Sequence, residues 1–160
     1  MITRLLPAVL IAATLAACGS GTSLTRQAPM TAQQVVAHLA QRVSSATPSV
    51  VFTAETDKNK LLGRPGGYVS KASFTDSRIS PTGEGFTDTS PGAADAGGSV
   101  EVFADDQAAG ARLKYIQAIT ANTPMFTEYD YVSGPVLVRV SRSLTPQQAA
   151  EYQSALAQIG

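Results

Sequence analysis

The carboxylates are the side chains of this sequence with the clearest potential for chemistry. Two acidic residues can act as general acid and base, and in glycoside hydrolysis such a pair stands about 5–10 Å apart. Four residues are candidates for a pair of this kind: Asp76, Asp105, Glu128 and Asp130. A small carboxylate hydrolase requires two of them to converge in one pocket, and this hypothesis fails if all four face solvent.

The same carboxylates also have structural interpretations, which we favour. Asp105 and Asp106 stand where a helix is expected to begin, and acidic side chains at that position cap backbone N–H groups and interact well with the helix dipole. Glu128 and Asp130 share one face of an expected strand whose other face carries two tyrosines. That pattern is typical of a solvated face beside a buried aromatic one.

Few other residues offer a catalytic or ligand-binding pattern. His38 is the only histidine and adjoins the apolar stripe of an expected helix, so we interpret it as a boundary or solvent-facing residue. The sequence has no nucleophile-elbow motif and too few histidines and cysteines for a typical zinc site. The glycine-rich stretch 63–67 lacks the spacing of a P-loop or a dinucleotide site. We therefore expect no catalytic residue, no metal and no cofactor.

A turn-rich loop is expected at 57–67. The favoured contact surface is residues 57–68 together with a Gly-, Ser- and Pro-rich segment at 80–98 that we expect to be mobile. Basic residues surround two leucines in the first loop, and these leucines either pack beneath the sheet or contact a partner. Packing is the favoured interpretation of the leucines themselves. The candidate interaction residues are Lys60, Leu61, Leu62, Arg64 and Tyr68.

The pattern of apolar residues and helix caps predicts the elements that position these side chains. Helices are expected at 31–47, 105–121 and 145–159, and strands at 50–56, 68–79, 99–104, 127–132 and 136–141. The first and last helices each begin with a capping box, at Thr31 and Thr145, and Pro48 is expected to close the first helical segment. The fold class is therefore α+β, a mostly antiparallel five-stranded sheet in the order α-β-β-β-α-β-β-α with about three helices, in the simplest case covering one face.

The N-terminus has the features of a secretory leader. A basic start, an apolar run from Leu5 to Thr14 and small residues before Cys18 match a cleaved signal, and the run is too short to span a bilayer. Leu15-Ala16-Ala17-Cys18 resembles the lipobox of bacterial lipoproteins, which implies lipidation of Cys18 and anchoring to the outer face of the cell membrane. The expected organisation is a signal peptide at 1–17, a flexible tether at 18–30 and one domain at 31–160.

Several short segments together resemble a family of small, uncharacterised actinobacterial lipoproteins. These segments are Asn59 to Tyr68, Asp76-Ser77-Arg78, Val100 to Phe103, Glu128 to Val132 and Leu144-Thr145-Pro146. The resemblance covers roughly residues 50–157. It implies a Gram-positive cell-envelope setting, and it brings no activity and no site residue to this chain.

These observations lead to a function of binding rather than catalysis. Twelve basic and twelve acidic residues leave the chain without net charge, so we expect no nucleic-acid partner. The favoured hypothesis is a non-enzymatic envelope module, anchored to the membrane through Cys18, that binds an envelope protein, peptide or glycan. The alternatives are the carboxylate hydrolase and a secreted inhibitor or immunity-type lipoprotein, which differs from the first only in what it binds.

Overall fold

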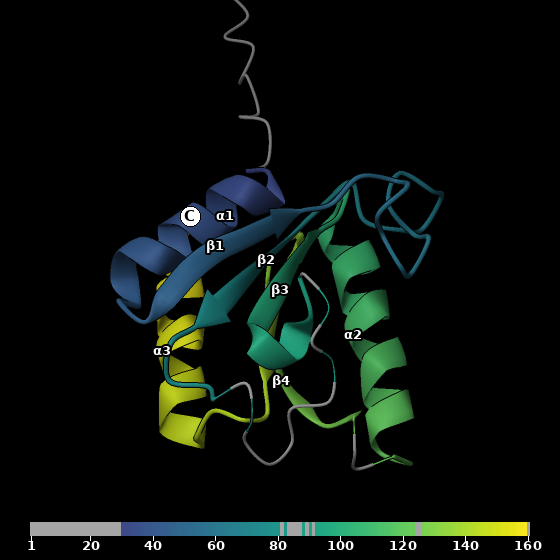
Figure 1. Ribbon diagram of the computed structural model, residues 1–160. Helices are drawn as coiled ribbons and strands as arrows, with labels where there is room; N and C mark the ends of the chain where they lie inside the picture. Colours follow the sequence, from purple (N-terminus) through teal and green to yellow (C-terminus); the bar gives the residue numbers. More distant parts are fainter. Residues whose placement is uncertain are drawn as a thin grey trace, which may run out of the picture.

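The computed structural model describes residues 30–80, 82, 88, 90, 92–123 and 126–159. The leader, Cys18, nearly all of the expected tether and most of the stretch from 81 to 91 lie outside the described residues. Within them, five strands form one antiparallel sheet that is accompanied by three helices (Figure 1), and this confirms the fold class and the element order. The elements are α1 (Ala32–Arg42), β1 (Ala46–Val51), β2 (Ser70–Asp76), β3 (Gly97–Val102), α2 (Asp106–Thr120), β4 (Glu128–Ser133), β5 (Val136–Ser141) and α3 (Pro146–Leu156), with a single 3₁₀ turn at Ala94–Ala96 before β3.

The strands lie side by side in the order β1-β2-β3-β5-β4, and every neighbouring pair is antiparallel. The register fixes which side chains share a face, because successive residues of a strand point to opposite sides. Ala72, Val100 and Val138 are paired across the three central strands on one face. Their neighbours Lys71, Glu101 and Leu137 are paired across the other, so the two faces differ strongly in polarity.

The caps that the sequence predicts for the helices are present. In α1 the Thr31 hydroxyl accepts from the Gln34 N–H while the Gln34 side chain accepts from the Thr31 N–H, and Thr145 and Gln148 repeat this arrangement in α3. Asp105 caps α2 by accepting from the Ala108 N–H. These bonds satisfy N–H groups that have no partner inside the helix, and this is why each helix begins where it does.

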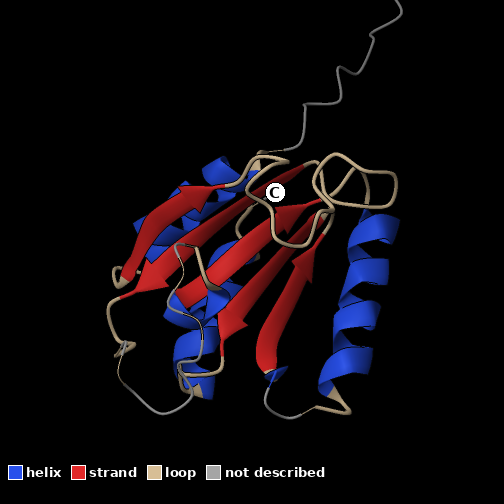
Figure 2. Cartoon of the chain, turned by 45° about the vertical axis from the view of Figure 1, so that its right-hand side comes forward, coloured by secondary structure: helices blue, strands red, loops and turns tan. Residues whose placement is uncertain are grey.

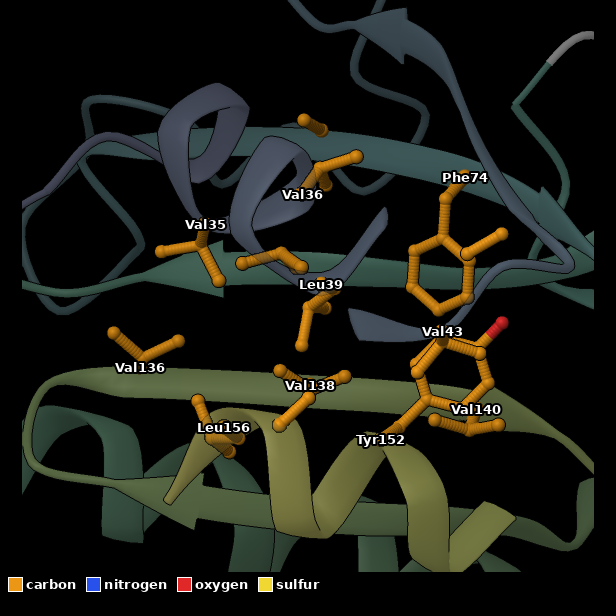
Figure 3. Packing of buried hydrophobic residues seen from close by; sticks show 14 of the residues in the cluster. Val35, Val36, Leu39, Val43, Phe74, Val136, Val138, Val140, Tyr152 and Leu156 are labelled. Carbon is orange, nitrogen blue, oxygen red and sulfur yellow. The ribbon is translucent and has the colours of Figure 1, made fainter. Parts of the chain in front are cut away.

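The main core lies between the sheet and the pair α1 and α3. Figure 2 shows both helices behind the sheet, and Figure 3 shows their side chains meeting those of β2 and β5. The rings of Phe74 and Tyr152 are stacked with their centroids 4.8 Å apart. Gly98 makes room for the Phe74 ring, because a Cβ atom at that position would overlap it. This core consists of residues between 30 and 159, so that part of the chain buries its own apolar surface.

The expectation that helices cover one face holds for α1 and α3 and is wrong for α2. Ala109 and Ile116 of α2 pack with Leu137, which points away from the main core, and with Tyr68 and Phe103. The polar, alanine-rich sequence of α2 offers only a narrow apolar stripe, and Ile119 near the end of the helix is 41% exposed. This helix therefore covers only the β4–β5 side of the second face, which we call the open face because a cleft remains on it. The segment around the 3₁₀ turn contacts β2, β3 and β5 on the same face (Figure 2).

The first strand differs most from expectation. It spans Ala46–Val51 rather than 50–56, and Pro48 lies inside it instead of closing the helical segment before it. β1 is an edge strand, and an edge tolerates proline because one side of the strand needs no ladder donor. The second and third strands also shift, to Ser70–Asp76 and Gly97–Val102, and α1 and α3 are shorter than expected.

A cleft on the open face of the sheet as candidate functional site

A cleft of about 770 Å³ lies on the open face, between α2, the 57–67 loop and the segment around the 3₁₀ turn. This volume falls within the range of about 300–1,000 Å³ that is typical of small-molecule sites. Its walls are largely apolar and come from α2, the following segment and the loop, through Tyr115, Ile116, Ile119, Phe126 and Leu61. Tyr115 and Phe126 are each 58% exposed, so two large aromatic side chains stand open at the rim, and the Arg112 guanidinium lies 5.5 Å from the centre of the Tyr115 ring.

The floor of the cleft is formed by the charged side chains of Arg139, Glu128 and Arg112, with the buried Glu101 beneath them. Arg139 of β5 forms ion pairs with Glu128 of β4 at 2.7 Å and with Glu101 of β3 at 3.4 Å. Arg112 of α2 reaches the same Glu101 at 3.0 Å. Glu101 is fully buried, and a buried carboxylate is tolerated only when it is paired, so two guanidinium groups hold it in place. The floor is thus a fixed network rather than a set of free charges.

The charges of this network hold Arg139 protonated. Burial alone would lower the pKa of Arg139, but the carboxylates of Glu128 and Glu101 outweigh that effect and hold its pKa above the ordinary value for arginine. Two of its side-chain nitrogens bond both oxygens of Glu128, which is the fork geometry that makes such pairs strong. This arginine is therefore a permanent, well-oriented cation at the centre of the floor.

Asp130 is the least satisfied carboxylate beside the cleft. It stands opposite Arg139 in the β4–β5 pairing and on the same strand face as Glu128, so the two candidate carboxylates do share one side of the sheet. The Oδ1 atom is buried, and no group among the described residues hydrogen-bonds it. Burial, and then the negative charge of Glu128, raise the pKa of Asp130 to about 7. The expectation of a fully solvated face is therefore wrong: the Glu128 side chain is only 10% exposed.

A smaller pocket of about 150 Å³ adjoins the cleft on the β2–β3 side. It is lined by three cationic side chains, those of Lys58, Lys71 and Arg139, and by Asn59 and Ser99 among others. Lys71 is only 8% exposed, and its ammonium group lies 3.0 Å from Asp57 and 4.7 Å from the centre of the Phe52 ring. Four residues line both pockets, so the two spaces lie next to each other: Asn59, Asp88, Ala94 and Arg139.

Asp57 fixes the shape of the 57–67 loop from inside. Its fully buried carboxylate accepts hydrogen bonds from the backbone N–H groups of Asn59, Leu61 and Leu62, from the Tyr68 hydroxyl at 2.7 Å and from Lys71 at 3.0 Å. Burial would raise the pKa of Asp57, but the bonds from Tyr68, Leu61 and Lys71 outweigh it and hold that pKa well below its usual range. The loop is therefore closed around one charge.

This anchoring separates the candidate interaction residues into three groups. Lys60 and Arg64 are exposed, as a contact surface requires. Leu61 and Leu62 are half-buried against the second apolar cluster, as the packing interpretation predicts, and Leu61 also lines the cleft. Tyr68 is a correction: it is fully buried, with its hydroxyl on Asp57 and its ring edge-on to Phe103, so it cannot contact a partner.

The remaining candidates have structural roles. Asp76 is buried at the opposite face, where it binds Tyr152, Arg78 and Ser45, and those bonds outweigh burial and lower its pKa to about 2. Asp105 caps α2, as expected. The Nε2 atom of His38 lies 3.1 Å from the Ala155 carbonyl oxygen, so this nitrogen carries the proton and the histidine bridges α1 and α3 at their boundary.

Sequence reasoning missed the charged groups that organise the site: Asp57, Lys71, Glu101, Arg112 and Arg139. The available signal was the alternation within the strands, since Arg139 interrupts a run of aliphatic residues and Glu101 stands between two valines. Alternation alone is typical of a strand whose polar face meets water. Only the pairing of strands and the position of α2 show that these charges meet each other under cover.

The described part of the chain gives no evidence of a bound metal or of a membrane span. Within it, no group of three or more His, Cys, Asp or Glu side chains is arranged to hold a metal ion. None of its helices combines the length and the apolar character that a bilayer crossing requires. Comparison of the chain with protein-family models, with curated proteins and with solved structures found no match in any of the three.

Proposed function

We propose that this protein is a membrane-anchored lipoprotein whose open-face cleft binds a small component of the cell envelope without transforming it. The observation that carries the proposal is the cleft itself, which combines exposed apolar walls with a floor of ion-paired charges. A binding pocket of this kind is mostly apolar and holds a few fixed polar groups that orient the ligand.

The charged floor supports binding more strongly than catalysis. Arg112, Arg139, Glu101 and Glu128 already satisfy one another, so the floor has its final geometry before a ligand arrives. A preorganised site loses less entropy on binding. The lipid anchor enters the proposal through the leader and the lipobox-like segment at Cys18, which would keep the cleft close to the membrane surface.

A dye that fluoresces in apolar surroundings tests the cleft directly. The protein from residue 19 to 160 keeps both apolar clusters and lacks Cys18, and we expect it to bind the neutral dye phenylnaphthylamine in a saturable manner. Ile119 lines the cleft and is partly exposed, so Ile119→Asp should weaken binding by about tenfold or more, the value of burying one large aliphatic side chain.

Two variants make this test specific. Val51 is 54% exposed and lines neither pocket, so Val51→Asp controls for the loss of an exposed apolar side chain and should leave the dye affinity unchanged. Arg64→Ala asks whether the exposed part of the 57–67 loop takes part. Equal weakening by Ile119→Asp and Val51→Asp, or the absence of saturable binding, would remove the cleft as the binding site.

The anchor needs its own measurement. Replacement of Cys18 by serine should move the full-length protein out of the membrane fraction in its processed form or leave it uncleaved. A Cys18→Ser protein that is still processed and membrane-bound would refute lipidation of this residue, whatever the cleft binds.

One observation favours a second candidate function, a small hydrolase that uses Glu128 and Asp130. The two carboxylates lie on one face of β4, and a pKa near 7 would let Asp130 hold a proton at neutral pH, as a general acid must. Against this, Glu128 is bound through both oxygens to Arg139, which leaves it little freedom as a base or nucleophile. Incubation with chromogenic glycosides and esters separates the hydrolase from the binding protein. Turnover that is lost in Asp130→Asn and kept in the control Glu55→Gln would establish the enzyme.

A further inference from the structure

The cleft and the smaller pocket together form one site with two unlike ends. The end near Ile116, Ile119 and Phe126 is apolar, and the end near Lys58 and Lys71 is cationic. Arg139 and Asn59 line both, so a single ligand can extend from one end into the other. Such a site matches an elongated molecule with one apolar and one charged part.

The charges that line the site have an excess of one sign. Five cationic side chains line the two spaces together, against three carboxylates. The cations are Lys58, Lys71, Arg112, Arg139 and Arg142, and the carboxylates are Asp88, Asp95 and Glu128. Two fully buried carboxylates, Asp57 and Glu101, line neither space and hold three of these cations in place from behind: Lys71, Arg112 and Arg139. Cationic groups therefore predominate in the lining that a ligand meets, most clearly in the small pocket, where Lys58, Lys71 and Arg139 stand against Asp88, while the buried carboxylates balance their charge from behind.

Hydrogen-bond donors in the small pocket are left over after all internal bonds are made. Ser99 is 3% exposed and lines this pocket, and its hydroxyl bonds to nothing among the residues that the structure describes. The Lys71 ammonium has three N–H donors and gives hydrogen bonds to Asp57 and Tyr68, which leaves one. The Ser99 hydroxyl is not one of the buried atoms that lack a partner, so it opens to the pocket, and a ligand that accepts from Ser99 and Lys71 takes the place of water there.

We propose that the site binds an anionic amphiphile, with its acyl or other apolar part in the cleft and its phosphate or carboxylate head in the small pocket. The head accepts from Ser99 and Lys71 and lies beside the fixed charge of Arg139. Lys58 stands at the pocket mouth, where its side chain is 67% exposed and its ammonium group lies 3.4 Å from Asp88. This inference rests on the proposed binding function of the cleft, and it adds the chemical class of the ligand.

Displacement of the neutral dye by chain-matched ligands tests the proposal. With the protein from residue 19 to 160 at pH 7, we expect dodecyl phosphate and dodecanoate to displace phenylnaphthylamine at least tenfold more tightly than neutral monododecanoyl glycerol. A tenfold difference in affinity corresponds to the free energy of one charge-assisted hydrogen bond, taken at the low end of the usual range. Equal affinity for the neutral and the anionic ligands would overturn the anionic head and leave the cleft as an apolar site.

Variants that remove donors from the small pocket make the test specific to that pocket. Ser99→Ala and Lys58→Gln should each weaken dodecyl phosphate severalfold while leaving the neutral glycerol ester and the dye unchanged. Lys60→Gln is the matched control, because Lys60 is an exposed lysine of the same loop that lines neither pocket. An equal loss with Lys60→Gln and Lys58→Gln would show attraction by overall charge only, which contradicts a built anion pocket.

Two further outcomes identify what has failed. If inorganic phosphate alone binds as tightly as dodecyl phosphate, free phosphate is the ligand of the small pocket and the amphiphile is refuted. If neither the dye nor any dodecyl ligand binds, the proposed function of the cleft falls and the inference falls with it. Binding of the dye without preference for anionic ligands refutes the inference alone.

Discussion

Replacement of Asp130 by asparagine is expected to stabilise the protein at alkaline pH. The side chain is half-buried on the open face, its Oδ1 atom has no hydrogen-bond partner among the described residues, and burial together with Glu128 raises its pKa to about 7. Above that pH the folded protein must hold a charge in a place that disfavours it. An asparagine has nearly the same shape and carries no charge.

The magnitude follows from proton linkage. In the unfolded chain an aspartate has a pKa of about 3.9, so between pH 4 and 7 the unfolded state has lost a proton that the folded state retains. Stability therefore falls as pH rises through this window, by at most about 1.4 kcal/mol per pH unit and about 2.7 kcal/mol between pH 5 and 7. Partial exposure of Asp130 reduces this, and we expect roughly 1–2 kcal/mol.

Urea unfolding of wild type and Asp130→Asn at pH 5 and pH 8 measures the effect. The difference in unfolding free energy between the two proteins should grow in favour of the variant from pH 5 to pH 8, while the contributions of other groups cancel. Glu55→Gln alters an exposed carboxylate whose pKa is lowered rather than raised, so it should show no such gain. A gain for Asp130→Asn that is equal at both pH values, or a loss that grows with pH, would refute the reasoning.

Three further predictions concern the other buried groups. Tyr152→Phe removes a 2.6 Å hydrogen bond to the buried Asp76 and should lower the free energy of unfolding by about 1.5–3 kcal/mol in urea at pH 7; a change below 0.5 kcal/mol would contradict this. Gly98→Ala forces a Cβ atom into the Phe74 ring and should cost about 1–3 kcal/mol or more, visible as a lower Tm in calorimetry. The pKa values of Asp57 and Asp76 are lowered in the folded protein, so these carboxylates contribute stability above pH 4 that is lost as pH falls towards 2. Acid unfolding followed by circular dichroism should therefore begin below pH 4. A fold that is as stable at pH 2 as at pH 5 would refute both assignments.

The local features of the fold could be predicted because they depend on neighbouring residues. Thr31 with Gln34, Thr145 with Gln148, and Asp105 each begin a helix where the sequence indicates, since a cap and its partner are three residues apart. The β4–β5 hairpin also forms, over Gly134 with its positive φ of 53°. Such signals need no knowledge of the rest of the chain.

The face that α2 occupies could not be predicted because it depends on competition between surfaces. Its polar, alanine-rich sequence provides a weak stripe, and the second cluster that receives it is assembled from Tyr68, Phe103 and Leu137, which lie far apart in the chain. The position of Pro48 inside a strand could not be predicted either, because a proline fits an edge strand and the sequence does not show which strand lies at the edge.

The charged floor of the candidate site is the clearest example of a feature that depends on strand pairing and could not be predicted from the sequence. Glu128 and Asp130 were recognised as a pair on one face, and the register confirms that they share it. Arg139, which pairs with both Glu128 and the buried Glu101, is 11 positions from the first in the sequence and 38 positions from the second. Without the register, each of these residues is simply the polar member of an alternating strand.

The carboxylate of Asp57 gives the protein a cross-link that needs no sulfur. It joins the start of its loop to Tyr68 and to Lys71, 14 residues further along, a span at which a disulfide would be worth about 3 kcal/mol. The chain has one cysteine and so cannot form an internal disulfide. The shape of the loop should consequently be indifferent to reductants and oxidants and sensitive to strong acid, and residues at its exposed tip, such as Lys60 and Arg64, can be exchanged without loosening it.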